Sequence, residues 1–148
     1  MNTQLTTTEI STAREILLNY APAQKALATL EENDGRLDAS FDRLWLEQNG
    51  PSPTYDLKSF HGVTLKVLRK ELCGDDDSFR SKVMEYNKNP GSTPLLTGLI
   101  VYLVGIAGLP IDPAIATVIV LYILKVGLNI FCEYTETPGA DSSNKNSS

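Results

Sequence analysis

The stretch that decides the fold is residues 94–109, PLLTGLIVYLVGIAGL, in which no side chain is charged. Pro94 suits the first turn of a helix, because a backbone N–H would have no partner within the helix at that position. A helix with this sequence is apolar on nearly every side, and none of its faces is suited to water. The stretch is therefore predicted to be a helix that is buried either in a protein core or in lipid.

A second apolar helix is predicted over residues 113–134, PAIATVIVLYILKVGLNIFCEY. The side chain of Asp112 is expected to cap its first turn, and Pro113 fits its first helical position. The predicted hairpin turn contains Pro110, Asp112 and Pro113. Two helices joined by so short a link are expected to pack antiparallel, so residues 94–134 are predicted to form an apolar hairpin.

Two stripes of side chains on these helices are candidate sites. Small residues recur at helical spacing on the first helix, where they would let another backbone approach closely, within the hairpin or between copies of the chain. They are Gly98, Val101, Gly105 and Gly108. A polar stripe on the second helix contains Tyr122, Lys125, Asn129 and Glu133. In a membrane the polar stripe would face protein or water, with Lys125 paired or reaching toward the surface.

Residues 1–93 carry most of the charge and are predicted to form about five short amphipathic helices. Their predicted starts are Thr6, where Glu9 completes a capping box, then Pro22, Asp38 or Ser40, Thr54, and the residues after Asp77. Their predicted inward-facing residues are Ile10, Ala13 and Leu17; Ala26, Leu27 and Leu30; Phe41, Leu44 and Trp45; Leu57, Phe60, Thr64 or Leu65, Leu68 and Leu72; and Phe79, Val83 and Tyr86. Residues 135–148 lack large apolar groups and are predicted to be a disordered tail.

Composition and motifs argue against catalysis and against nucleic-acid binding. The 148 residues are about one domain's worth, and 13 basic against 18 acidic side chains give a formal net charge of −5. His61 is the one histidine, and Asp75–Asp77 lack the spacing of a calcium loop, so neither a metal nor a cofactor is expected. No phosphate-binding loop or nucleophile elbow is present. Cys73 and Cys132 are predicted to be reduced, mostly buried thiols without a redox role.

The predicted fold is all-α: a small bundle of short amphipathic helices followed by an apolar antiparallel helical hairpin. The favoured hypothesis is a non-enzymatic, membrane-associated protein whose hairpin anchors in lipid or self-associates. Both termini would be cytoplasmic, with residues 1–93 contacting other proteins. The hairpin tip, residues 109–113, carries no Lys or Arg, as the positive-inside rule requires of the far side.

The free energies of membrane insertion favour this hypothesis only slightly over its alternatives. The apolar side chains of the second helix favour insertion by about 3 to 7 kcal/mol, and Lys125 opposes it by about 2.5 to 3.5 kcal/mol. The first helix would span about 24 Å, which is less than the roughly 30 Å hydrocarbon core. The alternative is a soluble, cytoplasmic all-helical adaptor whose apolar hairpin forms the core. A third hypothesis is a pore-forming or membrane-disrupting effector, with the polar stripe lining a wet path.

Overall fold

The computed structural model describes residues 4–50, 69, 72–73, 78–106, 111–127 and 132. Within these residues the secondary structure consists of helices, with no strand. The helices are α1 (Thr7–Ile16), α2 (Ala21–Glu32), α3 (Leu37–Asn49), α5 (Ser78–Lys88), α6 (Thr93–Val104) and α7 (Pro113–Val126). The prediction of an all-α fold is therefore confirmed for the part of the chain that the structure describes. Of the helix predicted from Thr54, residues 69, 72 and 73 are described; they are helical, and Leu72 is buried as predicted. The rest of that helix, His61, the Asp75–Asp77 turn and the tail 135–148 lie outside the described residues.

Local sequence signals set the starts of the first helices. The Thr6 hydroxyl accepts from the Glu9 backbone N–H at 3.1 Å, and the Glu9 carboxylate accepts from the Thr6 N–H at 2.8 Å. This reciprocal pair is the predicted capping box. Pro22 lies in the first turn of α2, also as predicted. Helix α3 begins at Leu37, one position before Asp38 and three positions before Ser40, the two alternative starts proposed from the sequence.

The turn between α2 and α3 requires a glycine. Gly35 has a φ of +83°, a conformation that residues with a Cβ rarely adopt. A Cβ at this position would also lie 2.1 Å from the backbone oxygen of Leu5. The close approach lets the Leu5 N–H donate to the Gly35 carbonyl at 2.8 Å. The start of the chain is thereby fixed against the α2–α3 turn.

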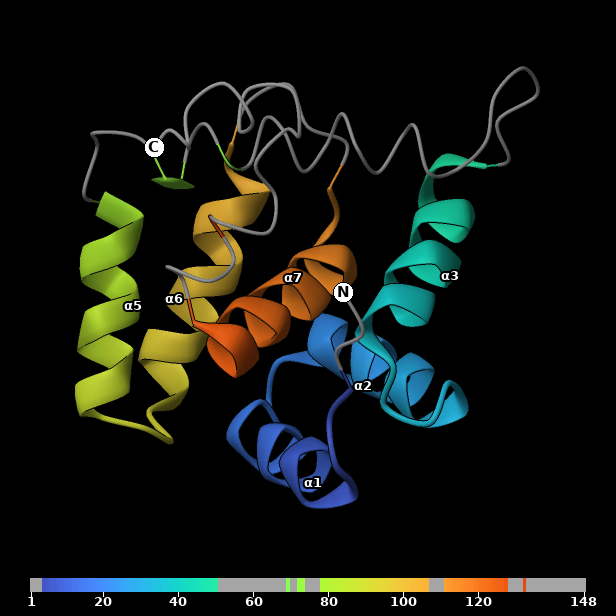
Figure 1. The fold of residues 1–148 in the computed structure, drawn as a ribbon, viewed down its shortest axis with the longest axis horizontal. Coiled ribbons are helices and arrows are strands. Elements are labelled where there is room, and N and C mark those ends of the chain that lie inside the picture. Colours follow the sequence, from blue (N-terminus) through green and yellow to red (C-terminus); the bar gives the residue numbers. More distant parts are fainter. Residues whose placement is uncertain are drawn as a thin grey trace, which may run out of the picture.

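Helix α7 is the centre of the core. It packs against α2, α3 and α6, and Figure 1 shows it between the α5–α6 side and the α3 side of the molecule. Nine of its fourteen residues are buried, in an unbroken run from Ala114 to Leu121 and again at Ile123. A helix that is apolar on every side needs partners on every side, and here the apolar faces of other helices supply them. Those faces include Ala26, Leu27 and Leu30 of α2, Phe41, Leu44 and Trp45 of α3, and Leu99 and Leu103 of α6.

The apolar helices are shorter than the sequence indicated, which corrects the membrane hypothesis. Helix α6 has 12 residues and α7 has 14, and these correspond to about 18 and 21 Å at 1.5 Å per residue, against roughly 30 Å of hydrocarbon. None of the helices that the structure describes is long and apolar enough to cross a membrane. The predicted membrane-spanning hairpin and membrane localisation are therefore wrong, and the pore hypothesis loses its basis.

The end of α7 shows where the sequence interpretation failed. The predicted helix continued to residue 134, whereas α7 ends at Val126. Gly127 follows with a φ of +93° and a ψ of 143°, a conformation that residues with a Cβ rarely adopt. Lys125 in the last turn is a further C-terminal signal, because a cation interacts favourably with the negative end of the helix dipole.

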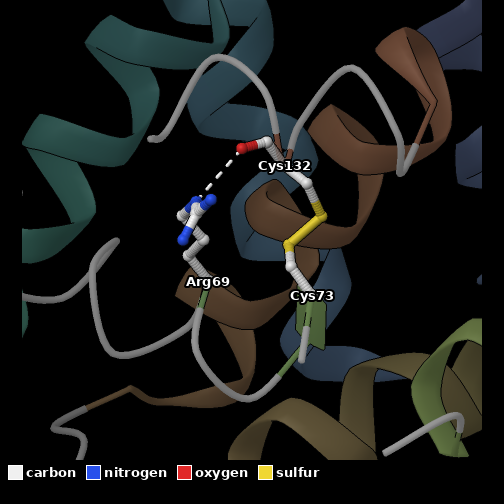
Figure 2. Close-up of a disulfide and its surroundings, with 3 residues drawn as sticks. All are labelled: Arg69, Cys73 and Cys132. Carbon is white, nitrogen blue, oxygen red and sulfur yellow. Dashed lines mark hydrogen bonds between the residues drawn. A yellow bond between two sulfur atoms is a disulfide. The ribbon is translucent and has the colours of Figure 1, made fainter. Parts of the chain in front are cut away.

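The prediction for the two cysteines is also wrong, because Cys73 and Cys132 form a disulfide. Their Cα atoms lie 5.9 Å apart, although the residues are 59 positions apart in the sequence. The prediction of reduced thiols was wrong because spacing along the chain does not report which segments the fold brings together. Figure 2 shows the bond beside Arg69.

Candidate functional site

A cleft of about 260 Å³ is formed by the start of the chain, α1, α5, α6 and α7. Its buried lining residues are Leu5, Ala13, Tyr86, Leu96 and Leu121. Its more exposed lining residues are Thr8, Glu9, Thr12, Ile16, Leu124 and Lys125. The burial pattern gives the cleft an apolar interior with two hydroxyl groups and one ion pair at its accessible side.

The ion pair joins α1 to α7 across the cleft. The Lys125 Nζ donates to both carboxylate oxygens of Glu9, each at 2.9 Å. Glu9 also accepts from the Thr6 N–H in the capping box, so one carboxylate stabilises the start of α1 and pairs with the lysine. The Lys125 side chain is 32% exposed. The cation of the predicted polar stripe therefore contacts another helix of the same chain.

This geometry lowers the pKa of Glu9. The hydrogen bond from Lys125 is the largest cause, followed by the hydrogen bond from the Thr6 backbone, and both favour the charged carboxylate. Since the pKa is lower in the folded state, this pair stabilises the fold above the ordinary glutamate pKa of about 4.3. The contribution is lost as the pH falls through the lower, folded-state pKa.

Replacing Lys125 with methionine is expected to raise the pKa of Glu9 toward its ordinary value while leaving it below, because the Thr6 hydrogen bond remains. The free energy of unfolding should fall by about 0.5 kcal/mol at pH 7, a small effect because both side chains are partly exposed to screening solvent. The difference in the free energy of unfolding between this variant and wild type should shrink as the pH approaches 3. NMR titration of the Glu9 carboxyl and chemical denaturation across that pH range would measure both effects. Lys88→Met, at the exposed end of α5, is the control, and an equal pKa change in that variant would contradict the assignment.

The small-residue stripe lies on the exposed side of α6. Gly98, Val101 and Gly105 are all exposed, and Gly108 lies outside the described residues. A Cβ built at Gly98 would meet nothing within 4 Å. The buried face of α6 is formed instead by Leu96, Leu99, Ile100 and Leu103. Within the described part of this chain no helix packs on Gly98, and self-association through the stripe stays a prediction.

The structure describes some of the remaining predicted site residues and not others. The Asp112 carboxylate accepts from the Ile115 N–H at 2.8 Å and caps α7, which Pro113 begins. Tyr122 is half-buried on α7. Pro110, Asn129 and Glu133 lie outside the described residues, so the structure does not describe the rest of the turn or of the polar stripe.

Sequence reasoning missed the cleft itself. It identified Glu9 as a helix cap and Lys125 as part of a polar stripe, but the two residues are 116 positions apart and no motif links them. The hydroxyls of Thr8 and Thr12 had no distinguishing signal, because threonines are mostly exposed in proteins. Glu9 gave no signal beyond its capping box, in which one carboxylate oxygen accepts from the Thr6 N–H.

Chemically, this cleft is suited to holding an apolar group. The ionisable side chains among its described lining residues are Glu9, Tyr86 and Lys125. Glu9 and Lys125 neutralise one another, and the Tyr86 hydroxyl accepts from the Gly91 N–H at 3.3 Å.

Comparisons of the chain with protein-family models, with curated proteins and with solved structures find no match.

Proposed function

We propose that this chain is a non-enzymatic all-helical adaptor, in which α6 and α7 form an apolar hairpin at the core and the surrounding helices bind a protein partner. The observation that carries the proposal is the burial of α7, whose residues from Ala114 to Leu121 are all covered. An apolar segment that is covered by the chain's own amphipathic helices acts as a core rather than as an anchor. The protein contacts expected of residues 1–93 then become the main activity.

The cleft beside α1 is the proposed partner surface. Its volume of about 260 Å³ is just below the range of roughly 300 to 1,000 Å³ that is typical of small-molecule sites. It is better matched to one or two apolar side chains of a partner. Side chains that anchor protein interfaces commonly enter such pockets, surrounded by polar groups that exclude water. Here Thr8, Thr12 and the Glu9–Lys125 pair would provide the polar surround.

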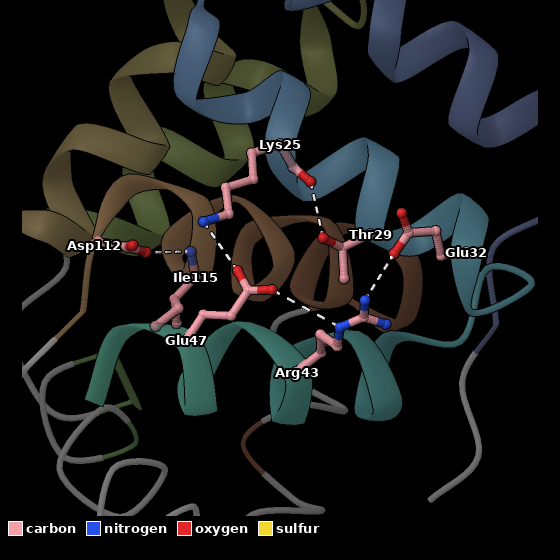
Figure 3. Close-up of polar contacts among 7 residues, drawn as sticks. All are labelled: Lys25, Thr29, Glu32, Arg43, Glu47, Asp112 and Ile115. Carbon is pink, nitrogen blue, oxygen red and sulfur yellow. Dashed lines mark hydrogen bonds and ion pairs between the residues drawn. The ribbon is translucent and has the colours of Figure 1, made fainter. Parts of the chain in front are cut away.

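The charged face of α2 and α3 is a weaker candidate. Figure 3 shows that its charges are matched within the chain. Lys25 lies 3.0 Å from Glu47, and Arg43 lies 3.8 Å from Glu47 and 3.3 Å from Glu32. Groups already paired in the free protein gain little from a charged partner, because the internal pairs must first be broken.

Fractionation of the expressed chain tests the core assignment. We expect recovery in the supernatant without detergent, both before and after an alkaline carbonate wash of the membranes. Retention in the carbonate-washed membrane pellet, with release by mild detergent, would contradict the proposal. This experiment addresses the helical core and is independent of the partner surface.

Filling the cleft tests the partner surface. Thr12→Trp places an indole at the cleft, and Ser11→Trp places the same group on the neighbouring exposed position of α1, outside the cleft lining. Both variants should retain the far-UV circular dichroism of wild type. We expect proteins that co-purify stoichiometrically with wild type to be retained by Ser11→Trp and largely lost from Thr12→Trp. Equal recovery with both variants would exclude the cleft, and the absence of any stoichiometric partner of wild type would contradict the adaptor function.

A further inference from the structure

The disulfide divides the described helices into two groups. Cys73 and Cys132 are 59 positions apart, so the covalent ring that they close contains α5, α6 and α7 and leaves α1, α2 and α3 outside. Both cysteines are half-buried, at the edge of the core. We therefore expect the bond to be within reach of a small thiol reagent without unfolding of the chain.

The core does not depend on this bond for its continuity. Its buried residues come from all six described helices and include Ile10, Leu27, Trp45, Phe79, Leu99 and Ile115. Contacts of α7 with α2 and α3 cross from inside the covalent ring to outside it. Disulfides are usually indispensable in chains too small to build such a core. We therefore expect the helices to remain packed when the sulfurs are separated.

Arg69 provides a second, non-covalent link between the segments that carry the two cysteines. Its Nε donates to the backbone oxygen of Cys132 at 3.1 Å, as Figure 2 shows. Arg69 lies four positions before Cys73, so the hydrogen bond holds Cys132 beside the segment that carries the other cysteine. Opening the sulfur–sulfur bond would leave this link intact and keep the two thiols near each other.

We propose that Cys73 and Cys132 are a reversible redox pair, opened by a dithiol reductant and held for closure by Arg69. A thiolate of the reductant attacks one sulfur, forming a mixed disulfide and releasing the other cysteine as a thiolate that takes up a proton. The second reductant thiol then loses its proton and attacks the mixed disulfide. The second cysteine leaves as a thiolate and is protonated in turn. Two electrons pass from the dithiol, which becomes a disulfide, to the cysteines.

The test uses the full chain in native buffer, with dithiothreitol as the dithiol and iodoacetamide as the thiol label. We expect no labelling before reduction and two labelled cysteines after it, with the helical circular dichroism signal largely retained. Removal of dithiothreitol and addition of oxidised glutathione should restore the disulfide. Failure of the cysteines to be reduced in native buffer, or loss of helix on reduction, would overturn the proposal and leave a purely structural bond.

The rate of closure tests the positioning role of Arg69. Arg69→Met should slow re-formation of the disulfide by about two- to tenfold, the range expected from loss of one ordinary hydrogen bond. Arg36→Met, which removes an exposed arginine outside the ring, should close at the wild-type rate. Equal rates for Arg69→Met and wild type would overturn the role of Arg69. This proposal is independent of the adaptor function, because its readouts require no partner.

Discussion

Replacing Cys73 with serine is expected to lower the free energy of unfolding by about 4 kcal/mol. The disulfide joins residues 59 positions apart, and the chain-entropy account gives about 3 kcal/mol for a 15-residue loop and about 4.7 kcal/mol for a 100-residue loop. The oxidised unfolded chain is restricted by the ring, and the variant is not. Domains of this size have a total stability of about 5 to 15 kcal/mol, so the variant should still fold.

Chemical denaturation in non-reducing buffer would measure this effect, and the double variant supplies its control. Cys132→Ser should lower the free energy of unfolding by the same amount as Cys73→Ser. The variant carrying both changes should lower it no further than either single change, because one bond is lost in every case. Additive losses would show that each side chain contributes separately through packing. A loss below about 1 kcal/mol in the single variants would contradict the loop-closure account.

The starts of the helices could be predicted from the sequence because their signals are local. The capping box of Thr6 and Glu9 and the Asp112 cap each act within three residues, and both are present as predicted. The apolar spacing in α5 also identified its buried residues, since Phe79 and Val83 face the core. Helix ends were less certain, as Gly127 shows, because a glycine is compatible both with continuing and with ending an apolar helix.

The surroundings of the apolar segment could not be predicted from its own residues. A helix such as α7 needs apolar neighbours, and its sequence does not state whether lipid or protein provides them. The answer depends on how α2 and α3 fold over it, which is a long-range property. The Glu9–Lys125 pair and the Cys73–Cys132 bond have the same character, because each joins residues that are distant in the sequence.

Two substitutions on α6 would decide which face of this helix belongs to the core. Leu99 is fully buried, whereas Val101, two positions on, is 54% exposed. Leu99→Ala is expected to lower the free energy of unfolding by about 2 to 5 kcal/mol, because it removes buried methyl groups and leaves a cavity. Val101→Ala should change it by no more than about 0.5 kcal/mol, and in the stabilising direction if helix propensity dominates.

The same pair of variants also separates a monomeric core from assembly through the small-residue stripe. If Gly98, Val101 and Gly105 formed an interface between copies, Val101→Ala would change the oligomeric state measured by light scattering, even with monomer stability unchanged. The same mass in solution for wild type and Val101→Ala would count against such an interface. A large loss of stability in Val101→Ala together with a small one in Leu99→Ala would reverse the two faces of α6. That result would contradict the arrangement in which Leu99, Ile100 and Leu103 lie within the core.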